Sequence, residues 1–68
     1  MTQEEAKQAI LKGEKITHVY FTPNEFITGS TSPHIVMDED GNLLNAAEFW
    51  FYRQSDYFQD GWSIYNKE

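Results

Sequence analysis

The stretch HIVMDEDGNLL, residues 34–44, decides the fold because it reads as two short strands joined by a tight turn. Its first four residues, of which the last three are apolar, have the length of a strand. The pair Asp40-Gly41 favours a hairpin that leads into residues 42–44. An antiparallel sheet is therefore predicted in the middle of the chain.

Further strands are predicted on both sides of this hairpin. Residues 15–21 alternate β-branched and aromatic side chains between two faces. A Pro-containing turn at 22–25 then leads into a short strand at 26–28, and residues 62–65 alternate as a last strand. The loop at 29–33 is polar and flexible in character. We expect a central antiparallel sheet of about four strands.

Two helices flank the predicted sheet. Thr2 and Glu5 have the spacing of a capping box, which predicts a helix over residues 3–12 that ends at Gly13. Asn45 and Glu48 repeat this spacing and predict a short second helix over residues 46–53. The expected architecture is a single α+β domain spanning residues 1–68.

The size of the chain limits how it can be stabilised. It has 68 residues and no Cys, so disulfides, thiolate zinc sites and cysteine nucleophiles are excluded. A domain this small buries only about 60% of its unfolded surface. Self-association, which buries apolar surface against a second copy, is the expected source of additional stability.

The charge excludes several classes of partner. Five Lys and Arg residues face eleven Asp and Glu residues, a formal net charge of −6, so direct binding of duplex nucleic acid is not expected. No apolar run approaches membrane-spanning length, and residues 1–5 lack the features of a signal peptide. We expect a soluble cytoplasmic protein that does not bind a membrane.

No arrangement of residues predicts catalysis, a metal site or a cofactor. His18 and His34 are the only imidazoles, and each lies in a predicted strand, where a structural role is the favoured interpretation. The acidic run at 38–41 lacks the remaining ligands of a calcium loop and is interpreted as a solvated hairpin tip. We predict that the protein is not an enzyme.

The aromatic content is the most informative feature. Five Phe, four Tyr and two Trp exceed what one small core can enclose, so some rings must meet a partner or a ligand. Residues 49–52 are four consecutive aromatics, and on a helix they point in several directions. Part of this run is therefore predicted to form either an interface between copies or a stacking wall for a nucleobase.

Three segments resemble a known family. Residues 32–37 followed by 40–44 resemble its Pro-aromatic-Ile-Val-Met strand and Asp-Gly hairpin, and residues 54–62 resemble its Ser/Thr-Asp segment before a terminal acidic-Trp strand. The opening at 5–16, a helix closed by Gly, is similar as well. The family is that of the type-two Thoeris anti-defence proteins, found in phages and prophages. Phe21 stands where the family usually has Trp, and residues 44–46 lack its Pro-Trp, whereas the added stretch 46–53 supplies Trp50.

The resemblance implies a function. It implies an α+β homo-oligomer, a homotetramer or homodimer, that binds a cyclic ADP-ribose signal of bacterial immunity without degrading it. A cyclic nucleotide needs a flat apolar partner, polar contacts to the base edge and donors for the pyrophosphate. The candidate ligand-binding residues are Phe21, Asn24, Trp50, Arg53, His18, Ser30 and Thr31, with Lys15 as a further donor. Because cations are few, the site is expected where copies meet.

A second function remains open on sequence grounds. A small acidic domain can cover the basic nucleic-acid groove of a defence nuclease, as anti-CRISPR or anti-restriction proteins do. The carboxylates at 38–40, with Asp56 and Asp60, would supply the negative charge. Such an inhibitor would form a salt-sensitive protein complex and would not bind a nucleotide.

Overall fold

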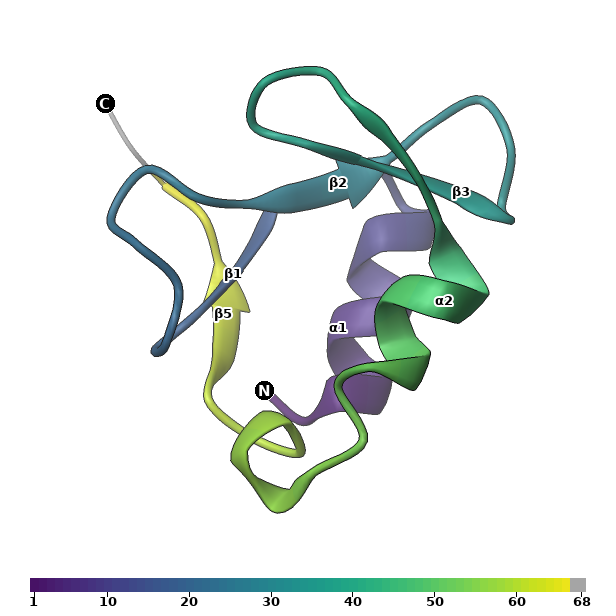
Figure 1. Ribbon diagram of the computed structural model, residues 1–68. Coiled ribbons are helices and arrows are strands. Elements are labelled where there is room, and N and C mark those ends of the chain that lie inside the picture. The colour runs from purple at the N-terminus through teal and green to yellow at the C-terminus, as the bar shows by residue number, and fades with distance from the viewer. Residues whose placement is uncertain (67–68) are drawn as a thin grey trace.

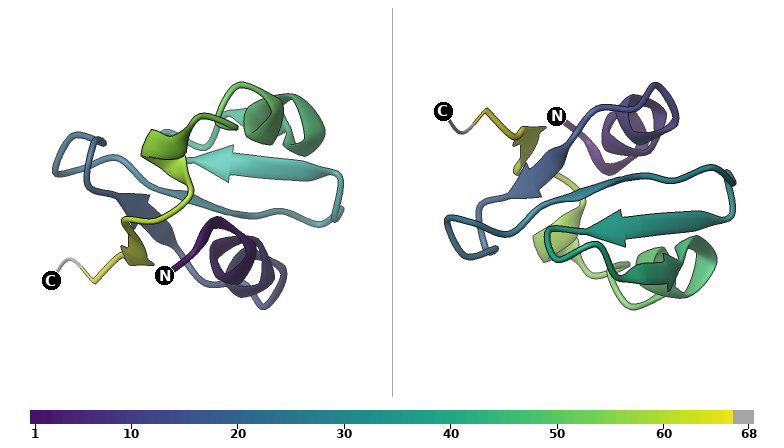
Figure 2. Two further views of the ribbon diagram at one scale, coloured as in Figure 1. Left: turned by 90° about the horizontal axis from the view of Figure 1, so that it is seen from below. Right: turned by 90° about the horizontal axis from the view of Figure 1, so that it is seen from above.

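The computed structural model of the protein describes residues 1–66 and confirms the α+β class. Two α-helices lie on one face of a five-stranded antiparallel sheet (Figures 1 and 2). The elements are α1 (Gln3–Leu11), β1 (Ile16–His18), β2 (Ile27–Gly29), β3 (Ile35–Asp38), β4 (Leu43–Asn45), α2 (Ala46–Phe51), the 3-10 helix η1 (Asp56–Phe58) and β5 (Trp62–Ile64). The sheet therefore has one strand more than the expected number of about four.

Helix α1 begins where the capping box predicts. The Oγ1 atom of Thr2 accepts a hydrogen bond from the backbone N–H of Glu5 at 3.2 Å, and the Glu5 carboxylate accepts from the N–H of Thr2 at 2.9 Å. The helix ends at Leu11, one residue before the predicted end. It buries Ala6, Ala9 and Ile10 against the sheet, so its inner face consists mainly of small side chains.

The strands are arranged in the order β4-β3-β2-β1-β5. Strand β1 pairs with β2 on one side and with β5 on the other, which places the last strand of the chain at one edge of the sheet. Figure 1 shows β1 and β5 running beside α1 while β2 and β3 pass across its end. The strands are three or four residues long, and β1 is shorter than the predicted run at 15–21 because the chain turns from residue 19 onward.

The predicted hairpin joins β3 to β4. Met37 pairs with Leu43, and Gly41 has a φ of +83°, a left-handed conformation that glycine adopts without strain. The Asp38 carboxylate accepts hydrogen bonds from the backbone N–H groups of Asp40 and Asn42, each at 2.9 Å. This carboxylate thus holds the turn in place.

One hydrophobic core joins both helices to the sheet. Its fully buried large side chains are Ile16 and Trp62. Gly29 allows α1 to approach β2 closely, because a Cβ atom at this position would lie 2.6 Å from the carbonyl oxygen of Ile10. The close approach fixes this end of α1 against β2.

Helix α2 follows β4 directly and is shorter than expected. The Asn45 side chain accepts a hydrogen bond from the N–H of Glu48 at 2.8 Å, as its spacing predicts. The helix ends at Phe51, two residues before the predicted end. Of its aromatic run only Phe49 is buried, whereas Phe51 and Tyr52 are 64% and 70% exposed. The prediction that this run points in several directions is confirmed.

None of the helices in residues 1–66 has both the length and the apolar character needed to cross a membrane.

Candidate functional site

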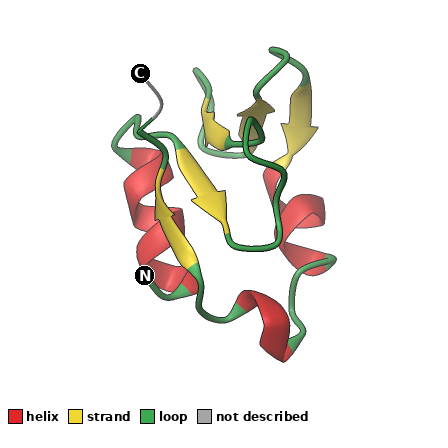
Figure 3. Cartoon of the chain, turned by 90° about the vertical axis from the view of Figure 1, so that its left-hand side faces the viewer, coloured by secondary structure: helices red, strands yellow, loops and turns green. Residues whose placement is uncertain are grey.

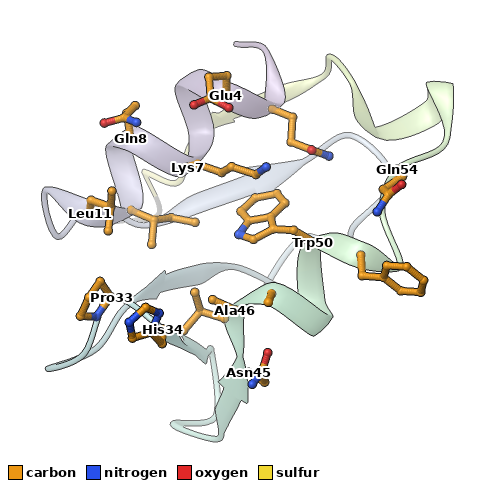
Figure 4. Close-up of a pocket in the computed structure, with 15 residues that line it drawn as sticks. Glu4, Lys7, Gln8, Leu11, Pro33, His34, Asn45, Ala46, Trp50 and Gln54 are labelled. Atoms are coloured by element: carbon orange, nitrogen blue, oxygen red, sulfur yellow. The ribbon is translucent and has the colours of Figure 1, made fainter.

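A groove of about 830 Å³ lies between α1 and α2 (Figure 4). Its floor includes Ile10 and Val36, which belong to the core. Both helices and the start of β3 contribute to its walls. We call this hollow the helix groove.

Trp50 forms the aromatic wall of the helix groove. The ring is partly buried, and its edge packs against Phe49 and Trp62 at centroid distances of 4.9 and 5.2 Å. Its indole N–H has no hydrogen-bond partner among residues 1–66. Figure 4 shows the indole reaching into the space between the helices. The ring is therefore held by its neighbours in the core, and it can still stack on a ligand and donate a hydrogen bond to it.

A lysine lies over this tryptophan. The Nζ atom of Lys7 is 5.4 Å from the centre of the Trp50 ring, which is within cation–π range. His34 lines the groove on the β3 side, away from Gln54 at the other end (Figure 4). Only one carboxylate, that of Glu4, belongs to the lining. The groove therefore has little negative charge in a protein whose net charge is −6.

Amide side chains supply most of the remaining polar groups. They belong to Gln3, Gln8, Asn45 and Gln54. The Gln3 amide already donates to the carbonyl oxygens of Arg53 and Phe58, at 2.7 and 3.1 Å, so it braces the groove. Exposed amides such as those of Gln8 and Gln54 have both donor and acceptor atoms, which the edge of a nucleobase requires.

Two predicted site residues lie beside the helix groove. Ser30 and Thr31 line a smaller hollow of about 230 Å³, which shares Ile10, Pro33 and Val36 with the helix groove. The Ser30 hydroxyl donates to the carbonyl oxygen of Ile35 at 2.8 Å and therefore organises this loop. Thr31 is exposed at the same place. The structure thus brings Trp50 and this loop to one side of the molecule.

His18 has a structural position in the core. It is 3% exposed, its Nε2 atom lies 2.7 Å from the carbonyl oxygen of Asp60, and its Nδ1 atom accepts from the N–H of Tyr20 at 3.1 Å. These partners assign the hydrogen to Nε2 and occupy both ring nitrogens. Phe21 packs edge-on against Trp62 at 5.6 Å. Neither ring lines the helix groove.

Arg53 packs into the same aromatic cluster. Its guanidinium lies 3.8 Å from the centre of the Phe49 ring, and its NH1 group donates to the carbonyl oxygen of Phe49 at 3.1 Å. Burial lowers the pKa of Arg53 from its ordinary value, and the charge of Glu25 opposes this shift. The buried Nε atom has no hydrogen-bond partner among residues 1–66. Arg53 therefore stabilises the packing between α2 and the core.

A second hollow, of about 470 Å³, is strongly acidic. Arg53 lines it together with four carboxylates, those of Glu25, Asp38, Glu39 and Glu48. Such a lining repels phosphate. Asn24 lies in the exposed turn before β2 and lines neither hollow. Lys15 is exposed, with its Nζ atom 5.0 Å from the centre of the Phe26 ring.

No group of three or more His, Cys, Asp or Glu residues in the described part of the chain has the arrangement of a metal site.

Sequence reasoning missed two groove residues, Lys7 and His34. Lys7 lies one helical turn from Gln3 and from Leu11, both of which also line the groove. This spacing marks one face of α1 and could have identified the lysine. His34 could not have been found in this way, because its position depends on how β3 packs beside α2.

Comparison of the chain with known protein families, with curated proteins and with solved structures finds no match. The resemblance to the type-two Thoeris anti-defence proteins therefore depends on the sequence segments alone.

Proposed function

We propose that this protein binds and sequesters a cyclic nucleotide signal, of the cyclic ADP-ribose type, in the helix groove. It would act in the cytoplasm of a bacterial host as a phage-type immune evasion protein. The observation that carries the proposal is the pairing of Trp50 with Lys7 in a hollow of about 830 Å³ whose lining includes only one carboxylate, that of Glu4.

The two residues match the two parts of a nucleotide. A base stacks on an aromatic side chain with a gain of about 1–3 kcal/mol. The flexible stem of Lys7 allows its ammonium group to leave the face of Trp50 and to reach a phosphate. His34 and the exposed Thr31 offer further donors at the β3 side of the molecule. The groove can therefore accommodate a base at one point and an anion close to it.

Sequestration requires affinity and copy number, and it requires no catalytic group. A dissociation constant in the nanomolar range corresponds to about −12 kcal/mol. Enclosure of most of the ligand surface is the usual source of such affinity in a small site. A groove open along one side encloses less of a ligand than a site closed by a second copy, so the proposal includes self-association.

An exposed ring supports this part of the proposal. Phe51 is 64% exposed. Phe51 also lines the helix groove, so an apolar contact between copies at this ring would cover the groove. We propose a homodimer or homotetramer in which the neighbouring copy completes the site.

Isothermal titration calorimetry with cyclic ADP-ribose tests the function. The wild-type chain should bind it, and Trp50→Ala should weaken binding by about tenfold to a hundredfold, the equivalent of one lost stacking contact. Lys7→Gln should weaken binding in a salt-dependent manner, because it removes the charge and retains much of the stem.

Tyr52→Ala is the matched control. Tyr52 is an exposed ring close to Trp50 in sequence, and it lines the acidic hollow. Its replacement should leave the affinity unchanged. Absence of binding by the folded wild-type chain, or equal losses for Trp50→Ala and Tyr52→Ala, would reject the helix groove as the site.

A further inference from the structure

An exposed tyrosine pair lies at the opposite end of β1 from α1's C-terminus, and it is distinct from the helix groove. The rings of Tyr20 and Tyr57 meet edge to face with their centroids 6.0 Å apart, and they are 65% and 69% exposed. Figure 3 shows η1, which carries Tyr57, beyond the ends of β1 and β5. We call these two rings the tyrosine patch.

The patch is held in position by the core beneath it. The backbone N–H of Tyr20 donates to Nδ1 of the buried His18, and the two rings lie 5.3 Å apart. Tyr20 also packs edge-on against Phe58, at 6.3 Å. Rings that are fixed in advance lose little conformational entropy when a partner binds. This property is typical of the aromatic residues that dominate protein interfaces.

Two carboxylates lie on the same segments. Asp56 immediately precedes Tyr57, and the backbone carbonyl of Asp60 contacts the His18 ring on which Tyr20 rests. Both side chains are exposed, and neither has a hydrogen-bond or ion-pair partner within residues 1–66. By contrast, the carboxylates of Glu5 and Asp38 are engaged in caps and turns.

No cationic side chain within residues 1–66 forms an ion pair with Asp56 or Asp60. Residues 16–52 contain no Lys or Arg, and neither do residues 54–66. Arg53 lies between these segments, but its guanidinium packs against Phe49. An exposed tyrosine pair with two exposed carboxylates on the same segments complements a cation, which can contact a ring face and a carboxylate together.

We propose that the tyrosine patch is a docking surface for an arginine-bearing segment of a partner protein. Arginine fits better than lysine, because its planar guanidinium stacks on aromatic rings and binds carboxylates through two parallel hydrogen bonds. The contact between Arg53 and Phe49 shows this stacking within the chain itself. The proposal is independent of nucleotide binding, since no residue of the patch lines the helix groove.

Titration with short blocked peptides, followed by the NMR signals of the aromatic rings, tests the proposal. Tetra-arginine should shift the Tyr20 and Tyr57 signals at lower concentration than tetra-lysine does, and tetra-glutamate should shift neither. The double variant Tyr20→Leu, Tyr57→Leu should weaken tetra-arginine binding at least fivefold. Asp56→Asn with Asp60→Asn should weaken it to a similar extent and remove most of its salt dependence.

A second exposed ring pair provides the control. Phe51 and Tyr52 meet edge to face at 5.4 Å and are similarly exposed. Phe51→Leu with Tyr52→Leu should leave tetra-arginine binding unchanged. Equal shifts at both ring pairs would show attraction by net charge alone and would overturn the proposal. Shifts of Tyr20 and Tyr57 caused by protein concentration or by cyclic ADP-ribose would assign the patch to a second copy or to the nucleotide, and would also overturn it.

Discussion

The ring centroids of the two tryptophans lie 5.2 Å apart, yet one ring is buried and the other faces a groove. Trp62 is 2% exposed, and its indole N–H donates to the carbonyl oxygen of Phe58 at 2.7 Å. Trp50 faces the helix groove, carries Lys7 over its ring and leaves its N–H without a partner in residues 1–66. Within this aromatic cluster Trp62 stabilises the fold, whereas Trp50 faces the groove in which we propose that the ligand binds.

The cations Arg53 and Lys7 differ in the same way as the two tryptophans. Arg53 lies on the inner side of α2, where it packs against rings and donates to a backbone carbonyl. Lys7 lies on α1, with its ammonium group over the ring of Trp50. It donates no hydrogen bond to a backbone carbonyl among residues 1–66. A cation that is already engaged contributes to stability, whereas an unengaged one can follow a ligand.

The largest expected effect separates the two tryptophans. Trp62→Ala should lower the free energy of unfolding by about 3–5 kcal/mol, because it removes a large buried ring and a satisfied hydrogen bond. Trp50→Ala should cost less than half as much, since its ring is only partly buried. Urea denaturation followed by circular dichroism measures both. Equal losses would remove the distinction between a structural and an available tryptophan.

A smaller effect separates the two cations. Arg53→Met should lower the free energy of unfolding by about 1 kcal/mol, because the loss of one hydrogen bond and of the ring contact is partly offset by the removal of an unpaired buried Nε atom. Lys7→Met should leave stability within about 0.5 kcal/mol of the wild type, as surface substitutions usually do. Urea denaturation measures both variants. A larger loss of stability in Lys7→Met than in Arg53→Met would contradict the structural role of Arg53.

Nucleotide affinity should show the opposite order for these two variants. Lys7→Met is expected to weaken binding of cyclic ADP-ribose, and Arg53→Met is expected to leave it unchanged if the variant is folded. A loss of affinity confined to Arg53→Met would move the site to the acidic hollow, which Arg53 lines.

The smallest effect concerns pH. The hydrogen bond from the backbone N–H of Asn42 is the main cause that lowers the pKa of Asp38 from its ordinary value of 3.8. A carboxylate with a lowered pKa stabilises the folded state above its unfolded pKa, and this contribution is lost as the pH falls through the folded value. Asp38→Asn should therefore lower the free energy of unfolding at pH 7 and reduce the further loss of stability between about pH 4 and pH 2. An unchanged acid profile would show that the turn does not depend on this carboxylate.

Much of the fold could be predicted from local patterns. The capping pairs Thr2 with Glu5 and Asn45 with Glu48 identify where both helices begin, because a cap depends only on residues a few positions apart. The Asp40-Gly41 turn identifies the hairpin for the same reason. The length of β1 could not be predicted, since the chain turns after His18 through contacts with residues of the distant 60–61 segment.

The candidate site was less predictable than the fold. Trp50 was identified from composition, because its aromatic run was too long for one helix face to bury. Lys7 shares a helix face with Gln3 and Leu11, but its contact with Trp50 could not be predicted, because the two residues are 43 positions apart in the chain. Arg53 is predicted from the sequence as a ligand donor, and its packing against Phe49 becomes visible only in the structure. Side chains from distant segments meet through tertiary packing, which local spacing does not encode.

The most direct test of the central claim is a calorimetric titration of cyclic ADP-ribose into the wild-type chain, Trp50→Ala and Tyr52→Ala at equal protein concentration. We expect tight binding by the wild type and Tyr52→Ala, and affinity weakened about tenfold or more in Trp50→Ala. No binding by the folded wild type, or full affinity in Trp50→Ala, would contradict the account.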